Sequence, residues 1–90
     1  MAVAERTVTI VNQLGLHARP SAEFVKLASR FRSSVLLKRD DLHVNGKSIM
    51  GVMTLAAEQG CQLLIRAEGE DADAAAEALA QLVGRGFSES

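Results

Sequence analysis

Residues 61–68 read Cys-Gln-Leu-Leu-Ile-Arg-Ala-Glu, an alternation of apolar and polar side chains in which Leu64 is the one exception. Because successive side chains of a strand point to opposite faces, this pattern is typical of a strand with one buried and one exposed face. Strands of this kind occur in antiparallel sheets that face water on one side. The sequence therefore predicts a sheet with one covered face, and helices elsewhere in the chain must cover it.

Two amphipathic helices are predicted to supply most of this cover. One follows the strand directly: it opens at Glu70-Asp71, where acidic residues suit the helix dipole, and it weakens at Gly84 and Gly86. The other begins at Ala18 and runs to about Arg32. The apolar sides of the two helices consist of Phe24, Leu27, Ala28 and Phe31 in the earlier one and Ala72, Ala75, Ala76, Leu79, Leu82 and Val83 in the later one.

Three further strands and one helix complete the expected order. The strands are predicted at about 3–11, 34–39 and 42–45, and the last two are joined by a tight turn at Asp40-Asp41. The remaining helix begins at Ser48, a good N-cap residue, and ends before Gly60. The order β-α-β-β-α-β-α favours an α+β fold in which one antiparallel sheet carries its helices on one face.

Composition and charge exclude several classes of protein. The chain has 90 residues, 48% of them apolar and 23% charged, which fits one globular domain spanning residues 1–90. Ten basic and eleven acidic residues without a long block of either sign argue against nucleic acid as a partner. No apolar run suits a signal peptide or a membrane span, so we expect a cytoplasmic protein. The single Cys61 is interpreted as a packed side chain, and no metal or other cofactor is expected.

The helix after Ser48 has more apolar residues than one face can bury. Its expected core stripe consists of Val52, Leu55 and Ala56. Ile49 lies at the edge of that stripe, and Met50 and Met53 point elsewhere. Two interpretations stay open: a helix buried on all sides, or an exposed methionine-containing patch that docks a protein partner.

His17 is the candidate for chemistry, because it stands at the start of a helix within Gly15-Leu16-His17-Ala18-Arg19-Pro20. The first turn of a helix leaves backbone N–H groups unpaired and can hold an anion. Arg19 adds planar donors that match phosphate oxygens, and Pro20 suits a first turn because it has no N–H to donate. The alternative role, a plain cap or surface residue, is the commoner one for such a histidine. His43 lacks these neighbours and is assigned no chemistry.

The motif at residues 15–20 and the later motif Lys47-Ser48-Ile49-Met50-Gly51-Val52-Met53 together resemble the HPr family, the phosphocarriers of the phosphoenolpyruvate-dependent phosphotransferase system. The resemblance spans nearly the whole chain. It implies an open-faced β-sandwich, in which a four-stranded antiparallel sheet is covered on one face by three helices. It also implies that phosphorylated enzyme I phosphorylates His17 at Nδ1 and that the carrier passes the group to an EIIA domain. On this reading the protein is a monomeric carrier and not an enzyme.

The resemblance also implies roles for residues around His17. Arg19 matches the arginine that assists the phosphate. The residues that match the partner-docking positions of the family are Ile49, Met50, Met53 and Thr54.

Ser48 matches the serine that HPr kinase/phosphorylase modifies in some lineages, which makes that kinase a further candidate partner. A phosphate at this N-cap would suit the helix dipole and add negative charge beside the docking positions. The alternatives are that Ser48 is only a cap, or that the protein is mainly a regulatory binding module that signals through Ser48. Residues 12–15 resemble the nitrogen-branch carriers, whereas residues 47–53 resemble carriers subject to the serine kinase, so both branches stay open.

Overall fold

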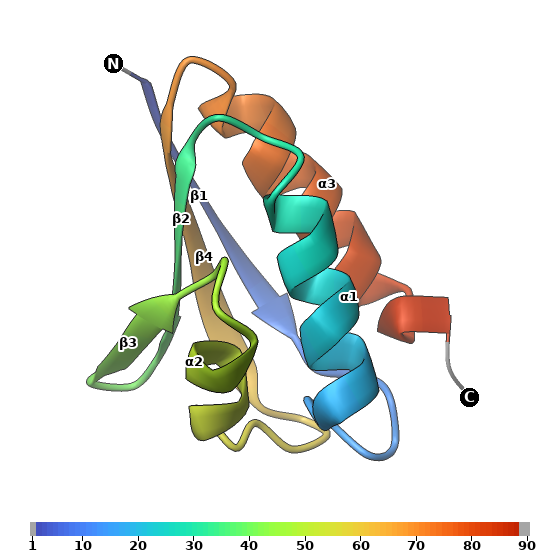
Figure 1. The fold of residues 1–90 in the computed structure, drawn as a ribbon. Helices are drawn as coiled ribbons and strands as arrows, with labels where there is room; N and C mark the ends of the chain where they lie inside the picture. Colours follow the sequence, from blue (N-terminus) through green and yellow to red (C-terminus); the bar gives the residue numbers. More distant parts are fainter. Residues whose placement is uncertain (1, 89–90) are drawn as a thin grey trace.

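The computed structural model describes residues 2–88, and it contains one four-stranded antiparallel sheet with three helices on one of its faces (Figure 1). The strands are β1 (Ala2–Thr9), β2 (Ser34–Arg39), β3 (Leu42–Asn45) and β4 (Gln62–Gly69). The helices are α1 (Ala18–Ala28), α2 (Ile49–Thr54), α3 (Ala72–Gly84) and a short 3₁₀ helix, η1 (Gly86–Ser88). The predicted α+β fold and its order of elements are confirmed.

The sheet has the strand order β1-β4-β2-β3, so β4 lies inside the sheet between the first two strands of the chain. The alternation read in its sequence is confirmed, because Leu63, Ile65 and Ala67 are buried against the helices. On the opposite face, Arg66 is exposed and Leu64 is half-buried. The sheet therefore has one covered and one uncovered face.

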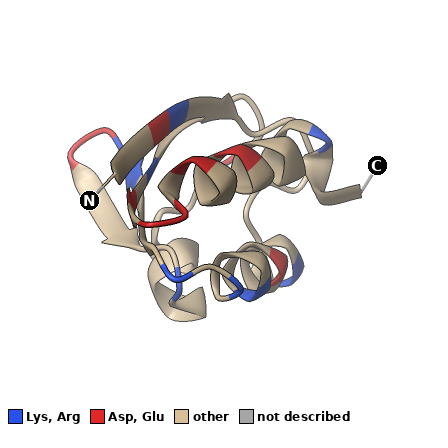
Figure 2. Ribbon diagram, turned by 90° about the horizontal axis from the view of Figure 1, so that it is seen from above, with Lys and Arg blue, Asp and Glu red and all other residues tan. Residues whose placement is uncertain are grey.

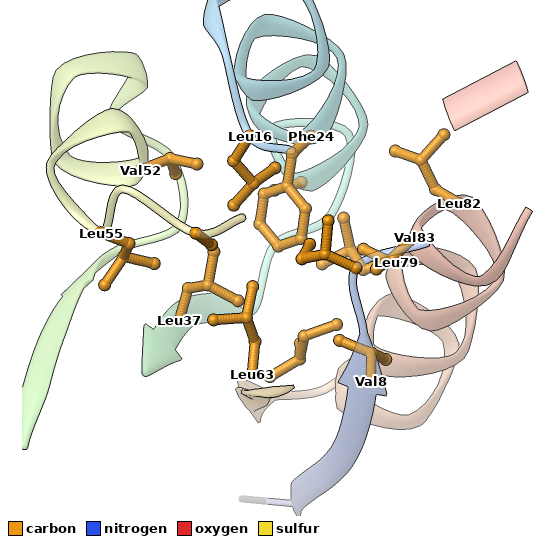
Figure 3. Close-up of a cluster of buried hydrophobic side chains, with 14 of the residues drawn as sticks. Val8, Leu16, Phe24, Leu37, Val52, Leu55, Leu63, Leu79, Leu82 and Val83 are labelled. Carbon is orange, nitrogen blue, oxygen red and sulfur yellow. The ribbon is translucent and has the colours of Figure 1, made fainter. Parts of the chain in front are cut away.

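The core lies between this covered face and the helices. Phe24 of α1 is fully buried near its centre, with Val52 of α2 and the adjoining Leu55 on one side and Leu79 of α3 on the other (Figure 3). A second, smaller cluster of buried alanines lies where α3 packs against β1 and β4. All six residues predicted for the apolar side of α3 are buried, which confirms that stripe.

The first strand and the first helix end earlier than predicted. β1 stops at Thr9, although Ile10 still exchanges backbone hydrogen bonds with residues 60 and 61. α1 stops at Ala28 instead of about Arg32, because the N–H groups of Arg30 and Phe31 bond three residues back and tighten the turn. The N–H groups of Arg32 and Ser33 then donate to the side chain of Asp71, just before α3, rather than to carbonyls of α1.

The second helix has only six residues and ends at Thr54 instead of just before Gly60. Ala56 adopts a positive φ of 49°, which a helix does not tolerate, so the chain leaves the helical path there. Ala56 is therefore exposed, and the prediction that it belongs to the core is wrong. Ala57 is buried instead.

Asp71, the N-cap residue of α3, ties that helix to the end of α1. Its Oδ1 accepts hydrogen bonds from the Ser33 N–H at 2.9 Å and the Ser33 hydroxyl at 2.5 Å, and its Oδ2 accepts from the Arg32 N–H at 2.9 Å. These donors, the Ser33 hydroxyl above all, lower the pKa of Asp71 from 3.8 to about 2. Because the pKa is lowered on folding, the stabilisation is complete above about pH 4 and is lost as the pH falls towards 2.

Candidate functional site

His17 is the N-cap residue of α1, as the sequence predicts. Its backbone is extended, with φ −75° and ψ −172°, and its carbonyl accepts the Ser21 N–H at 3.1 Å. The side chain makes no capping hydrogen bond and is half-buried. It lines an open depression of about 770 Å³, whose other lining residues are Gln13, Leu14, Arg19, Glu23, Phe87 and Ser88. A reactant on another protein can therefore reach the imidazole.

The depression combines two sources of positive potential. The first turn of α1 leaves the N–H groups of Ala18 and Arg19 without acceptors inside the helix. The Arg19 side chain is exposed and lines the same depression as His17. Together the backbone N–H groups and the guanidinium suit the oxygens of a phosphoryl group. The sequence-predicted pair, His17 and Arg19, is thus brought together in one place.

The loop before His17 is held by buried polar contacts that the sequence analysis missed. The side-chain Nδ2 of Asn12 donates to the carbonyl of Gly15 at 2.8 Å, and the Ser21 hydroxyl donates to the carbonyl of Leu16 at 3.1 Å. The Leu16 N–H in turn donates to the carbonyl of Ala57 at 2.9 Å. In the sequence, the only indication of these contacts was Asn12, since an asparagine side chain in a turn commonly forms hydrogen bonds with nearby backbone groups.

Gly15 allows this loop to lie against the segment that follows α2. Its φ is +66°, a region that favours glycine, and a Cβ placed there would come within 2.3 Å of the Ala57 carbonyl oxygen. The position of His17 therefore depends on contact between the 12–17 loop and the α2–β4 connection.

The C-terminal turn forms another side of the depression. Phe87 of η1 is buried, with a φ of 57°, and lines the depression together with Ser88. Leu14 also lines the depression and is 74% exposed. Neither Phe87 nor Leu14 was predicted as a site residue, because each stands outside the periodic part of a helix or strand.

Ser48 is the N-cap residue of α2, which confirms its predicted structural role. Its Oγ accepts the Gly51 N–H at 3.0 Å, and its own N–H donates to the Asn45 carbonyl at 3.1 Å. The side chain is half-buried.

The surplus apolar residues of α2 are exposed. Ile49, Met50 and Met53 are 43%, 79% and 41% exposed, and we call these three residues the α2 patch. The interpretation of α2 as a helix buried on all sides is therefore wrong. Thr54 is also exposed, and its hydroxyl donates to the Gly51 carbonyl at 2.6 Å. Because α2 packs against α1, the α2 patch belongs to the same helical layer as His17 (Figure 1).

Charge is divided between the two long helices. Figure 2 shows mainly basic residues on α1 and its following turn, where Glu23 of α1 is the acidic exception, and acidic residues on α3. The sequence places Arg19, Lys26 and Arg30 in or just after α1, and Asp73 and Glu77 in α3. The side of the molecule that carries His17 is thus the more positive one. Separately, no helix among residues 2–88 is long and apolar enough to cross a membrane.

Comparison with known proteins gives one consistent family. The family model described as "PTS HPr component phosphorylation site" matches residues 4–85. Proteins named phosphocarrier protein HPr are 46% identical over 85 residues in Xylella fastidiosa and 48% identical over 84 residues in Treponema pallidum, covering 94% and 93% of this chain and 96% of each relative. A crystal structure of HPr-C-His from Thermoanaerobacter tengcongensis superposes with a TM-score of 0.92 at 45% identity, covering 97% of this chain and 98% of that one.

Proposed function

The chain belongs to the HPr family of phosphocarriers of the phosphotransferase system, and on this basis we propose that His17 accepts the phosphoryl group from phosphorylated enzyme I and passes it to an EIIA domain. The protein is thus a phosphoryl carrier and not a catalyst. The observation that supports His17 most strongly is its place at the N-cap of α1, in an open depression shared with Arg19. His43, the other histidine, lies on the edge strand β3 with neither a helix start nor an arginine beside it in the chain.

The geometry suggests how the group is held. An imidazole nitrogen of His17 attacks the phosphorus, and the new P–N bond forms as the bond from phosphorus to the donor breaks. The unpaired N–H groups of the first turn and the Arg19 guanidinium then face the charged phosphoryl oxygens. Because the depression is open, an acceptor on a second protein can attack the same phosphorus, and the P–N bond then breaks as the bond from phosphorus to the acceptor forms.

The test is to incubate the protein with phosphoenolpyruvate and enzyme I and to map the label. We expect one phosphoryl group per chain, lost in acid, on the peptide that contains His17. A label on His43, or an acid-stable label, would contradict the assignment.

We also propose that the α2 patch, with Thr54, docks both enzyme I and EIIA. Exposed methionines adapt to differently shaped surfaces, which suits a carrier that must bind its donor and its acceptor in turn. One shared surface also ensures that the two partners bind alternately rather than together.

Met50→Asp is therefore expected to lower kcat/KM for phosphorylation by enzyme I about tenfold, because a charge would be buried against the partner. The unfolding midpoint should stay unchanged, since Met50 is 79% exposed. The matched control is Leu42→Asp, which makes a similar change at another exposed apolar residue, on β3. Equal kinetics for both variants would show that docking occurs elsewhere.

Ser48 supports a second, regulatory function: phosphorylation by HPr kinase/phosphorylase. A phosphate on its Oγ would lie at the start of α2 and add about −1.5 to −2 charges beside the α2 patch. We expect ATP and the kinase to give an acid-stable label that is absent from Ser48→Ala and present in Ser34→Ala. The labelled protein should accept phosphoryl groups from enzyme I more slowly. If the kinase leaves the protein unlabelled, Ser48 acts as a cap alone.

We further propose that residues 1–90 act as one domain, as a monomer, in the cytoplasm. The proposed function applies equally to a sugar branch and to a nitrogen branch of the phosphotransferase system.

A further inference from the structure

An arginine of the sheet contacts the segment that connects α2 with β4. Arg39 is the last residue of β2, and the alternation of the strand places its side chain on the same face as Leu37, towards the helices. The side chain is half-buried. Its Nη1 donates to the carbonyls of Leu55 and Ala56, each at 2.8 Å. One cationic nitrogen therefore joins the end of the sheet to the chain just after α2.

The two carbonyls that Arg39 contacts belong to a turn that local propensity does not favour. Leu55 is the C-cap residue of α2, and the last carbonyls of a helix lack an N–H partner within it. Ala56 has a φ of +49°, which residues with a Cβ rarely adopt. A cationic side chain at a helix C-terminus satisfies such carbonyls and suits the helix dipole. Arg39 thus stabilises the path that the chain takes out of α2.

The residue after this turn carries the contact with the loop before His17. The carbonyl of Ala57 accepts the Leu16 N–H at 2.9 Å, and both residues are buried. The same carbonyl oxygen is the atom that leaves no room for a Cβ at Gly15. Since Leu16 directly precedes His17, the conformation of Ala56 determines where this support for the imidazole lies.

We propose that Arg39 is a positioning residue for phosphoryl transfer: it holds the α2–β4 connection so that the Ala57 carbonyl fixes the peptide before His17. This inference rests on the proposed function. Among residues 2–88, Arg39 is not one of those that line the depression, so it acts through the backbone and not on the phosphoryl group.

The first test measures amide hydrogen exchange and needs no partner protein. In Arg39→Met, exchange of the Leu16 N–H should become about tenfold faster, because the turn that presents the Ala57 carbonyl opens more often. The N–H of Gly46, which donates to the Val35 carbonyl at 2.7 Å, should exchange as in the wild type. The matched control is Lys38→Met, which removes the same charge from the neighbouring exposed residue of β2 and should leave both rates unchanged.

The second test measures phosphorylation by enzyme I. Arg39→Met should lower kcat about fivefold, because a small displacement of a nucleophile slows transfer, and should change KM by less than about twofold. Arg39→Lys should restore most of the rate, since both bonds come from one nitrogen and an ammonium group can replace it. If Arg39→Met does not fold, Arg39→Gln takes its place in both tests.

A double variant tests whether the effect passes through the Ala57 contact. Gly15→Ala already forces the loop away from the Ala57 carbonyl, so adding Arg39→Met should lower kcat by less than about twofold more.

Three results would overturn the proposal: Leu16 exchange at the wild-type rate in Arg39→Met, a change in KM alone, or a full fivefold further loss in the double variant. A change in KM alone would mean that Arg39 supports only the α2 patch. If enzyme I leaves the wild-type protein unphosphorylated, the proposed function fails, and the exchange rate of the Leu16 N–H still decides whether Arg39 holds the loop.

Discussion

His17→Ala is expected to abolish phosphorylation by enzyme I to below detection. The variant lacks the nucleophile, and the other residues that line the depression provide no second imidazole: they are Gln13, Leu14, Arg19, Glu23, Phe87 and Ser88. The unfolding free energy should change by no more than about 1 kcal/mol, since the side chain makes no capping hydrogen bond and is only half-buried. Incorporation of phosphate from phosphoenolpyruvate, measured beside an unfolding curve, checks both statements.

His43→Ala is the matched control, because it removes the same side chain from an exposed position of β3. It should be phosphorylated at the wild-type rate. If His17→Ala retains the label, or if His43→Ala loses it, the phosphoryl acceptor is not His17.

Gly15→Ala is expected to damage both stability and transfer. Any residue with a Cβ at a φ of +66° costs about 1–2 kcal/mol. The new Cβ would also come within 2.3 Å of the Ala57 carbonyl oxygen, so the 12–17 loop and the α2–β4 connection must separate. Because that contact positions His17, the rate of phosphorylation by enzyme I should fall. A loss of 1 kcal/mol lowers the unfolding midpoint of a domain of this size by about 4–8 °C.

Gly60→Ala distinguishes the effect of backbone strain from the effect of the clash with the Ala57 carbonyl. Gly60 has a φ of +90° but nothing lies within 4 Å of its hypothetical Cβ, so this variant has the backbone strain without the clash. It should lose less stability than Gly15→Ala and transfer phosphate normally. If both variants behave alike, the close approach to Ala57 has no part in positioning His17.

The architecture could be predicted because each element has a clear local pattern. The apolar stripe of α3 lies in six regularly spaced positions, and all six are buried. The end of α2 could not be predicted, because it depends on the positive φ of Ala56, a residue whose propensity favours helix. The guanidinium of Arg39, far away in the sequence, donates to the carbonyls of Leu55 and Ala56 at this turn, and such a contact leaves no local signal.

Within the candidate site, only residues of the motif at 15–20 could be predicted, because their residue types suit phosphoryl chemistry and they lie next to one another in the chain. His17 and Arg19 stand in one short motif, and both line the same depression. Phe87 and the buried hydrogen bond of Asn12 were missed, since each contributes through the tertiary fold.

The strand order has a consequence for biosynthesis. β1 is an edge strand that pairs only with β4: Ala2 lies opposite Gly69, and Thr9 lies opposite Gln62. When the ribosome releases β1, its only neighbour has not yet been made. The β2–β3 hairpin can form locally, whereas closure of the sheet must wait for most of the chain. During translation the first strand thus stays an unpaired edge until β4 has been synthesised.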